Sequence, residues 1–285
     1  MIHSMTGYGK SELELSTKTI RLELKSLNSK SLDLNMRMPS IYRAKELELR
    51  KIIGSKLGRG KIDFSLYVEF NKGEALAKIN TEVVKGYMKQ LENISLADEV
   101  ELLKMAVRMP DAISTEREDI DPKEWKTISD EVLVVLEKIE NYRKDEGAAL
   151  EKDFSKRISK IDDLLKDVVK IDPERIEHVR DRLNKGIAEL KEKVDKNRFE
   201  QELIYYIEKL DITEEKIRLK NHLDYFLKNL NLDESNGKKL GFISQEIGRE
   251  INTIGSKANY APMQKLVVQM KDELEKIKEQ LLNVL

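Results

Sequence analysis

The sequence lacks cysteine, and this absence removes several kinds of chemistry at once. Disulfides, cysteine-ligated zinc, iron–sulfur clusters and thiol nucleophiles are excluded, and such a chain is typical of a reducing compartment. Histidine is scarce as well, since the 285 residues contain only His3, His178 and His222. A multi-histidine metal site is therefore hard to build. Any metal has to be held mainly by carboxylates, which favours Mg²⁺ or Mn²⁺ over Zn²⁺.

Long apolar runs are also missing. No stretch approaches the roughly 18 apolar residues of a membrane-spanning helix, and the start "MIHSMTGYGK" has no apolar core of signal-peptide length. We therefore expect a cytoplasmic protein without membrane attachment. The sequence contains no G-x-x-x-x-G-K-[ST], G-x-S-x-G or H-E-x-x-H, so it shows no sign of P-loop, α/β-hydrolase or zincin chemistry.

Charge is balanced overall but unevenly distributed. The formal net charge is −1, whereas the stretch from Lys18 to Lys61 holds twelve Lys and Arg against four acids, a local balance of +8 that leaves −9 elsewhere. Such asymmetry is typical of a face that binds a polyanion. The alternative, basic residues merely spread around a domain, stays open at this point.

The first part of the chain has the periodicity of strands. Residues 3–38 contain two alternating runs, "STKTIRLELKSLN" and "SLDLNMRM", and "IDFSLYVEF" is a further strand. Between them, "IYRAKELELRKIIGSKL" predicts a helix with Ser40 as its N-cap. Strands, helix and strand make a small α+β unit. Its basic residues fall on strands and turns that can share one surface.

From about residue 81 the periodicity is helical. An acidic break, "AISTEREDIDPKEW" (112–125), precedes a very long helix that we expect to end before Asp172-Pro173. Further helices are predicted over roughly 197–210, 212–232, 236–257 and 261–283, with Asp211 or Thr213 as a cap. Long charged helices with an apolar seam usually pair with another helix, in the same chain or in another subunit.

These patterns predict an α+β fold that is predominantly α overall. A small N-terminal strand-rich α+β domain is followed by long helices and a C-terminal all-helical domain. The predicted ranges are 1–155 for the N-terminal domain running into a long helix, 156–199 for a helical connector and 200–285 for the C-terminal domain.

The predicted helix 236–257 carries more polar groups than a helix needs. At 100° per residue its isoleucines gather on one face. Glu246, Glu250, Thr253 and Lys257 form a stripe beside that face, and Gln245, Arg249, Asn252 and Ser256 form the next. Three glycines, Gly241, Gly248 and Gly255, lie seven residues apart on the far side, where another backbone or a ligand has room to approach.

Two carboxylates stacked one turn apart repel each other unless a cation lies between them. A metal ion, or Arg249 with Lys257, can supply that cation, and an ordinary salt-bridged surface is the alternative. In the preceding helix Glu215, Arg218 and His222 border an apolar set. The short connection favours antiparallel packing. If His222 faces the acidic stripe, its ordinary pKa near 6.5 suits proton transfer; otherwise it is a core histidine.

Several blocks of the sequence resemble the YicC/YloC-like protein family. They include "SMTGYG", "SLNSKSLDLNMRMP", "YRAKELELR" leading to "LGRGKIDFSL", and "DEGAALEKDF". The resemblance is densest in "FEQELIYYIEKLDITEEKIRLKNHLDYF", "GKKLGFISQEIGREINTIGSKA" and "KDELEKIKEQLLNV". The sequence departs from the family pattern at Gly248, where an asparagine is expected, and at Gly241, where an acid is expected.

The resemblance implies a bacterial cytoplasmic endoribonuclease that depends on a divalent metal, Mn²⁺ or Mg²⁺. It also implies a ring-like homo-hexamer with a central space for RNA, and a stress-induced role in RNA turnover and in the control of small regulatory RNAs. Other RNA-decay enzymes are possible partners. A basic N-terminal domain is consistent with this, because Lys and Arg attract phosphates with little sequence preference.

The matching motifs assign roles to particular residues. Glu246 and Glu250 are expected metal ligands, with Asp211 and Glu215 as further candidates. His222 is the expected general acid or base, and Arg249 and Lys257 stabilise charge on the phosphate. Arg218, Asn252 and Thr253 are the candidate RNA contacts in these motifs, and in the basic N-terminal region we expect Arg37, Arg59 and Lys61 to contact RNA phosphates. The "GRGK" segment holding Arg59 and Lys61 is alternatively only a polar turn.

Two other functions remain open from the sequence. The first is a non-catalytic RNA-binding adaptor or scaffold that recruits a partner nuclease, which would keep the basic face and need no metal. The second is a purely structural helical assembly protein, which would show no salt-dependent affinity for RNA.

Overall fold

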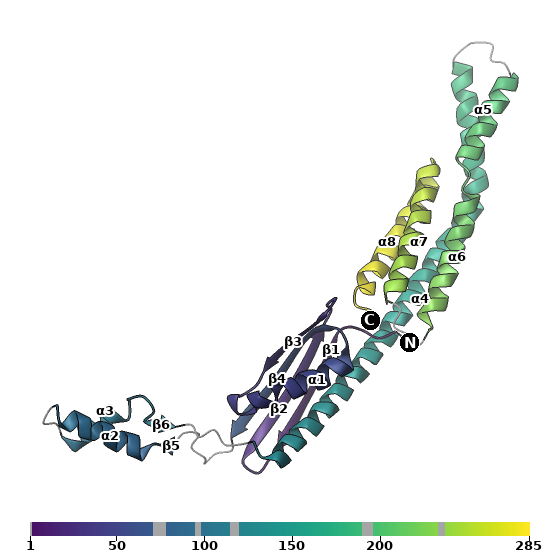
Figure 1. The fold of residues 1–285 in the computed structure, drawn as a ribbon. Coiled ribbons are helices and arrows are strands. Elements are labelled where there is room, and N and C mark those ends of the chain that lie inside the picture. Colours follow the sequence, from purple (N-terminus) through teal and green to yellow (C-terminus); the bar gives the residue numbers. More distant parts are fainter. Residues whose placement is uncertain (1, 71–77, 95–97, 115–119, 190–195, 233–236) are drawn as a thin grey trace. The chain divides into compact units, whose positions relative to one another are not determined.

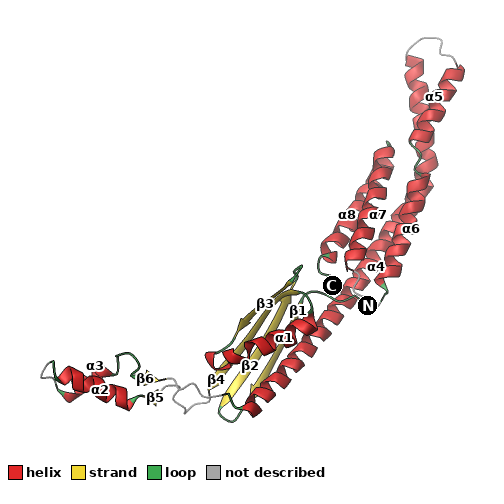
Figure 2. Ribbon diagram, viewed as in Figure 1, coloured by secondary structure: helices red, strands yellow, loops and turns green. Residues whose placement is uncertain are grey.

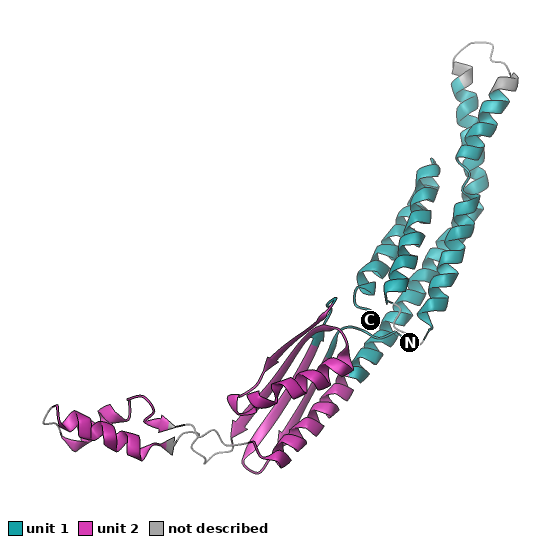
Figure 3. Ribbon diagram, in the orientation of Figure 1, with its two compact units in different colours: residues 1–7, 26–30, 140–285 teal, residues 8–25, 31–139 magenta. Residues whose placement is uncertain are grey.

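The protein is described here by a computed structural model covering residues 2–70, 78–94, 98–114, 120–189, 196–232 and 237–285. The chain divides into two compact units (Figure 3). Unit 1 comprises residues 1–7, 26–30 and 140–285, and unit 2 comprises residues 8–25 and 31–139. The domains predicted from the sequence, 1–155, 156–199 and 200–285, divide the chain differently and stay a prediction.

A four-stranded sheet forms the centre of unit 2 (Figure 2). Its strands are, in spatial order, β1 (Gly7–Glu14), β2 (Lys18–Leu27), β4 (Gly60–Phe70) and β3 (Leu32–Arg37). Strands β3 and β4 are parallel, with Leu32 paired to Gly60 and Arg37 to Ser65. A parallel pair needs a crossover connection, which is supplied by the 3-10 helix η1 (Ser40–Lys45) and by α1 (Glu46–Leu57).

Alternation along the strands gives the sheet one apolar and one polar face. Helix α1 and the first part of α4 (Pro122–Glu189) cover the apolar face. The core between them contains Ile20, Leu22, Leu24, Ile53, Ile62, Phe64, Leu66, Ile128 and Val135. The opposite face carries the polar side chains of each strand.

A smaller element of unit 2 pairs β5 (Lys78–Ile79) with β6 (Ile113–Ser114) beside α2 (Thr81–Glu92) and α3 (Glu99–Ala106).

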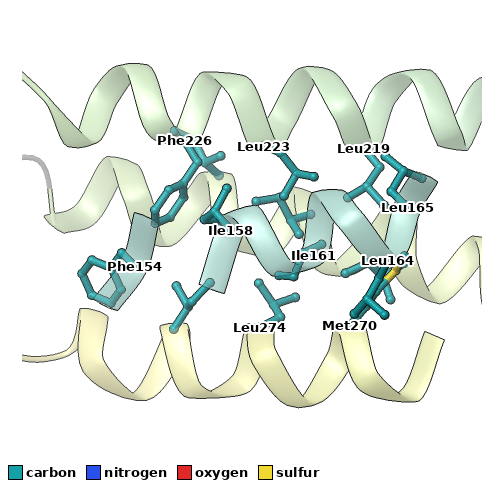
Figure 4. Close-up of a cluster of buried hydrophobic side chains, with 14 of the residues drawn as sticks. Phe154, Ile158, Ile161, Leu164, Leu165, Leu219, Leu223, Phe226, Met270 and Leu274 are labelled. Carbon is teal, nitrogen blue, oxygen red and sulfur yellow. The ribbon is translucent and has the colours of Figure 1, made fainter. Parts of the chain in front are cut away.

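A helical bundle makes up most of unit 1 (Figure 1). The rest of α4 packs with α6 (Thr213–Leu230), α7 (Gly237–Lys257) and α8 (Ala261–Leu281), while α5 (Lys196–Lys209) precedes α6. Figure 4 shows the side chains that interlock between the helices. They include Phe154, Ile158, Ile161, Leu219, Leu223, Phe226, Met270 and Leu274. None of the helices in the described part of the chain has the length and apolarity needed to cross a membrane.

The two ends of the chain meet in unit 1. The backbone amide of Leu285 donates to the carbonyl of His3 at 2.9 Å, and the amide of Gly237 donates to Leu285 at 3.2 Å. A Cβ atom on Gly147 of α4 would lie 2.0 Å from the carbonyl oxygen of Ile2. The N-terminal segment therefore passes so close to α4 that only glycine fits at this position.

The predicted fold class, α+β and predominantly helical, is confirmed by these elements. The predicted helices over 197–210, 212–232, 236–257 and 261–283 are confirmed within a few residues as α5 to α8. Parts of the predicted acidic break (115–119) and of the turn before α7 (233–236) lie outside the described residues.

Two local predictions are wrong. Ser40 is not an N-cap, because the helical segment begins there as η1, its cap position is Pro39, and no side chain hydrogen-bonds the cap. Helix α4 does not end before Asp172-Pro173 but continues to Glu189. Ion pairs hold α4 beside the proline: Asp172 binds Arg175 at 2.8 Å and Lys216 of α6 at 2.7 Å. Tertiary contacts thus outweigh the local cost of a proline inside a helix.

Candidate active site

The candidate site lies where α6 packs against α7, and both helices belong to unit 1. The apolar faces of the two helices enter the bundle core. Polar residues at the borders of those faces are thereby brought together along what we call the α6–α7 seam. It comprises Glu215, Arg218 and His222 of α6 with Glu246, Glu250 and Lys257 of α7.

Glu250 lies among several charged residues of the seam. The residue is 9 % exposed, and its carboxylate is not among the buried side-chain groups of the described residues that lack a hydrogen-bond partner. Burial raises the pKa of the Glu250 carboxyl, and the cationic charges of Arg218 and His222 partly offset that rise. The negative charges of Glu215 and Glu246 raise this pKa further. All four groups therefore lie within electrostatic reach of Glu250.

Lys257 spans the seam at its other end. Its ammonium donates to Oε1 of Glu215 at 2.7 Å and to the backbone carbonyl of Asp211 at 2.8 Å. The second oxygen of Glu215, Oε2, is buried and has no hydrogen-bond partner in the described structure. A buried carboxylate oxygen without a donor is unfavourable for the fold. The unpartnered Oε2 atom of Glu215 therefore calls for an explanation.

The neighbouring stripe of α7 is more exposed. Arg249 donates to Oε1 of Glu246 at 2.7 Å, although the Arg249 side chain is 72 % exposed. Arg249 thus pairs with Glu246, and a metal ion between Glu246 and Glu250 stays a prediction. The hydroxyl of Thr253 donates to the carbonyl of Arg249 at 3.0 Å, and Asn252 is exposed. Arg218 of α6 pairs with Glu214.

The structure also places the remaining predicted metal ligand. The carboxylate of Asp211 accepts hydrogen bonds from the hydroxyl of Thr213 at 2.8 Å and from its backbone amide at 3.3 Å. These hydrogen bonds lower the pKa of Asp211, so its carboxylate stays ionised at the start of α6. The N-cap position of α6 is nevertheless Ile212 and no side chain hydrogen-bonds that cap, so the prediction that Asp211 or Thr213 caps this helix is wrong.

Within the described residues, no three His, Asp or Glu side chains are close enough to form a ready-made metal site. A cage made only of protein ligands is not what the seam offers. Mg²⁺ is usually held by one or two carboxylates together with water and substrate phosphates. Glu250, and the unpartnered Oε2 of Glu215, fit that lighter requirement.

The glycines of α7 have a structural explanation. A Cβ on Gly248 would lie 3.2 Å from Leu274 of α8, and one on Gly255 would lie 3.0 Å from Val267 of the same helix. These two glycines allow α8 to pack closely, so the approach predicted from their spacing is made by the chain itself. Nothing lies within 4 Å of a Cβ on Gly241.

The predicted phosphate contacts of the N-terminal region lie in unit 2. Arg37 ends β3 and lines a hollow of about 190 Å³ on the open face of the sheet. Its other lining residues are Glu23, Lys25, Asp63, Ser65 and Tyr67. Lys61 is exposed beside Asp33 in the register of β3 and β4, and Arg59 precedes β4. Acids alternate with bases on this face, so the local balance of +8 is not concentrated there. Sequence reasoning missed Lys25 and Tyr67, although strand alternation places both on the face of Arg37.

Comparison with known proteins agrees with the resemblance noted in the sequence. The families described as "Endoribonuclease YicC-like, N-terminal region" and "Endoribonuclease YicC-like, C-terminal" match residues 2–152 and 168–285. The chain belongs to the YicC-like endoribonuclease family. Two relatives carry the name "Probable endoribonuclease YicC". The one from Clostridioides difficile is 32 % identical, the one from Haemophilus influenzae is 29 % identical, and each alignment covers both chains completely. The α6–α7 seam lies in the C-terminal matched region.

Proposed function

We propose that this protein is a divalent-metal-dependent endoribonuclease and that the α6–α7 seam is its catalytic centre. The observation that carries the proposal is the environment of Glu250. A carboxyl group whose pKa is raised by burial lies near two further acids, a histidine and an arginine. Perturbed ionisable groups gathered in this way are typical of functional sites. The names of the relatives supply the reaction class.

Glu246 and Glu250 are the proposed metal ligands, with water and phosphate oxygens completing the coordination. Mn²⁺ or Mg²⁺ bound there supplies a Lewis acid for the phosphate and a more acidic water. A cation would also relieve the mutual repulsion of the three acids, which raises the pKa of Glu250. Asp211 is left out of this set because its carboxylate already accepts two hydrogen bonds from Thr213.

The other residues of the seam contribute protons and positive charge. His222 is the proposed general acid or base, since an imidazole changes its protonation near neutral pH. Arg249 and Lys257 are proposed to stabilise the negative charge that develops on the phosphate. The guanidinium of Arg249 donates to Glu246, and the ammonium of Lys257 donates to Glu215. Arg218, Asn252 and Thr253 are proposed RNA contacts. Arg37, Arg59 and Lys61 are proposed to bind RNA phosphates on unit 2.

Further features follow from the family and belong to the same proposal. They are a cytoplasmic location, a homo-hexameric assembly, a stress-induced role in RNA turnover, and action on small regulatory RNAs. Light scattering coupled to size-exclusion chromatography tests the hexamer, because the measured mass of the particle is then six times the 33.1 kDa of one chain.

The experiment that tests the function uses protein washed in high salt, so that host nucleases are removed. A 5′-labelled single-stranded RNA is incubated with Mn²⁺, with Mg²⁺ and with EDTA, and products are resolved on a denaturing gel. We expect internal cleavage that needs the metal. Mn²⁺ binding followed by electron paramagnetic resonance gives a readout independent of cleavage. RNA that is bound but never cut would favour the adaptor function instead.

A further inference from the structure

Two aromatic side chains are exposed at one end of the α6–α7 seam. The side chain of Tyr225 on α6 is 45 % exposed and that of Phe242 on α7 is 68 % exposed. Their immediate neighbours Phe226 and Ile243 enter the bundle core, so neither exposed ring is needed for packing within unit 1. Exposed apolar side chains mark a binding surface where they lie together and are rimmed by polar residues.

Helix geometry places both rings beside the proposed catalytic residues. Tyr225 follows His222 by three residues, and Phe242 precedes Glu246 by four, so each is one turn away from a seam residue on the same helix. Because α6 and α7 run antiparallel, both steps lead toward the same end of the seam. The ammonium of Lys239 lies 5.4 Å from the centroid of the Tyr225 ring, which joins the start of α7 to this part of α6.

We propose that Tyr225 and Phe242 form a base-stacking subsite for an unpaired nucleotide of the RNA, next to the bond that is cut. This inference rests on the proposed function, since it names the substrate class of the same site. Unpaired bases stack readily on aromatic side chains, whereas the base faces of a duplex are already covered.

The charges around the two rings suit a nucleotide better than an apolar partner. Lys238 and Lys239 are both exposed at the start of α7 and provide positive charge for the phosphates on either side of a stacked base. An aromatic face with adjacent cations is the combination that single-stranded nucleic acids prefer. The subsite therefore makes the enzyme selective for single-stranded RNA.

Helix α5 provides a matched control. The Tyr205 side chain is 55 % exposed, and Lys209 lies 5.8 Å from the centroid of its ring, so it resembles the Tyr225–Lys239 pair in both exposure and contact. Tyr205 is not part of the α6–α7 seam. Tyr205→Ala thus removes an equivalent ring without touching the subsite.

The experiment measures the affinity of the full-length protein for a fluorescein-labelled oligouridine by fluorescence anisotropy, in EDTA so that no cleavage occurs. Tyr225→Ala and Phe242→Ala are each expected to weaken binding by about five-fold or more, the lower end of what one stacked base contributes. Tyr225→Phe keeps the ring and is expected to bind as the wild type does, as is Tyr205→Ala. Affinity for the same strand annealed to its complement should not change.

Normal oligouridine affinity in both alanine variants would overturn the subsite. Equal losses for single strand and duplex would overturn it too, as would a loss that accompanies a smaller oligomer in light scattering, since the rings would then lie between copies of the chain. The outcome is separable from that of the nuclease assay. Stacking without any metal-dependent cleavage contradicts only the enzyme proposal, and cleavage with unchanged affinities contradicts only the subsite.

Discussion

Lys257 of α7 donates a hydrogen bond to Glu215 of α6 at 2.7 Å, and the Glu215 side chain is only 8 % exposed. This ion pair joins the end of one helix to the start of the other. It holds the seam together while leaving the second oxygen of Glu215 without a partner.

Lys257→Met should therefore lower stability more than most surface substitutions. Removing one partner of a buried ion pair costs about 3–5 kcal/mol, and because Lys257 is 31 % exposed we expect the lower end of that range. The double variant with Glu215→Gln should recover part of the loss. Arg249→Met is the control, since Glu246 and Arg249 are more exposed and such pairs contribute about 1 kcal/mol or less. Urea denaturation gives the free energy of unfolding of each variant and of the wild type. Equal losses of stability in Lys257→Met and Arg249→Met would contradict the burial of the Lys257–Glu215 pair.

Glu250→Gln should raise the thermal midpoint at pH 7. Burial raises the pKa of Glu250 above its ordinary value of 4.5, so the folded protein holds this proton more tightly than the unfolded chain does. Ionised Glu250 consequently weakens the fold at neutral pH, and the penalty disappears as the pH falls below 4.5. Scanning calorimetry from pH 7 to pH 4 should show the gain of the variant shrinking. A variant less stable than wild type at pH 7 would contradict this explanation.

Glu273 should show the opposite pH dependence. Lys160 at 2.7 Å, with Lys276 and Arg157, lowers the pKa of this carboxyl to about 2. Its stabilisation is complete above the ordinary value of 4.5 and is lost as the pH falls toward about 2. At neutral pH, Glu273→Gln should cost up to roughly 3 kcal/mol, at about 1.4 kcal/mol per pKa unit. The exposed Glu275 is the control, and Glu275→Gln should change stability little at any pH.

Gly147→Ala should be among the most damaging single substitutions in unit 1. The added Cβ would lie 2.0 Å from the Ile2 carbonyl oxygen, which belongs to backbone and has no flexible side chain to yield. Gly241→Ala is the matched substitution in open space, where replacing a helical glycine gains about 1 kcal/mol. Thermal unfolding of the two variants should therefore shift in opposite directions. A tolerated Gly147→Ala would mean that the N-terminal segment does not pass along α4.

Periodicity predicted the helices of the C-terminal region well, because their buried faces repeat every three to four residues. It also grouped Glu246 with Glu250, and the short connection predicted that α6 and α7 pack, which brings His222 toward Glu250. It did not reveal which residue Lys257 binds. The helical wheel placed Lys257 in the stripe of Glu250, whereas its partner is Glu215 on the other helix.

Other features depend on contacts between distant segments and were beyond any local pattern. Pro173 predicted a helix end, yet Asp172 is fixed by Lys216, which lies far along the chain. The charge balance from Lys18 to Lys61 suggested one basic face. Parallel pairing of β3 and β4 instead places Asp33 beside Lys61, and this register cannot be derived from composition.

The central claim is that the α6–α7 seam cuts RNA, and a single-turnover cleavage assay tests it most directly. The wild type, Glu250→Gln and the control Glu275→Gln are compared on the same labelled single-stranded RNA with Mn²⁺. We expect Glu250→Gln to lose about 100-fold or more in rate, in line with the contribution of groups that bind metal or move protons. Its oligomeric state and RNA affinity should persist, and its stability should not fall. Equal cleavage by the wild type and Glu250→Gln would show that the catalytic centre lies elsewhere.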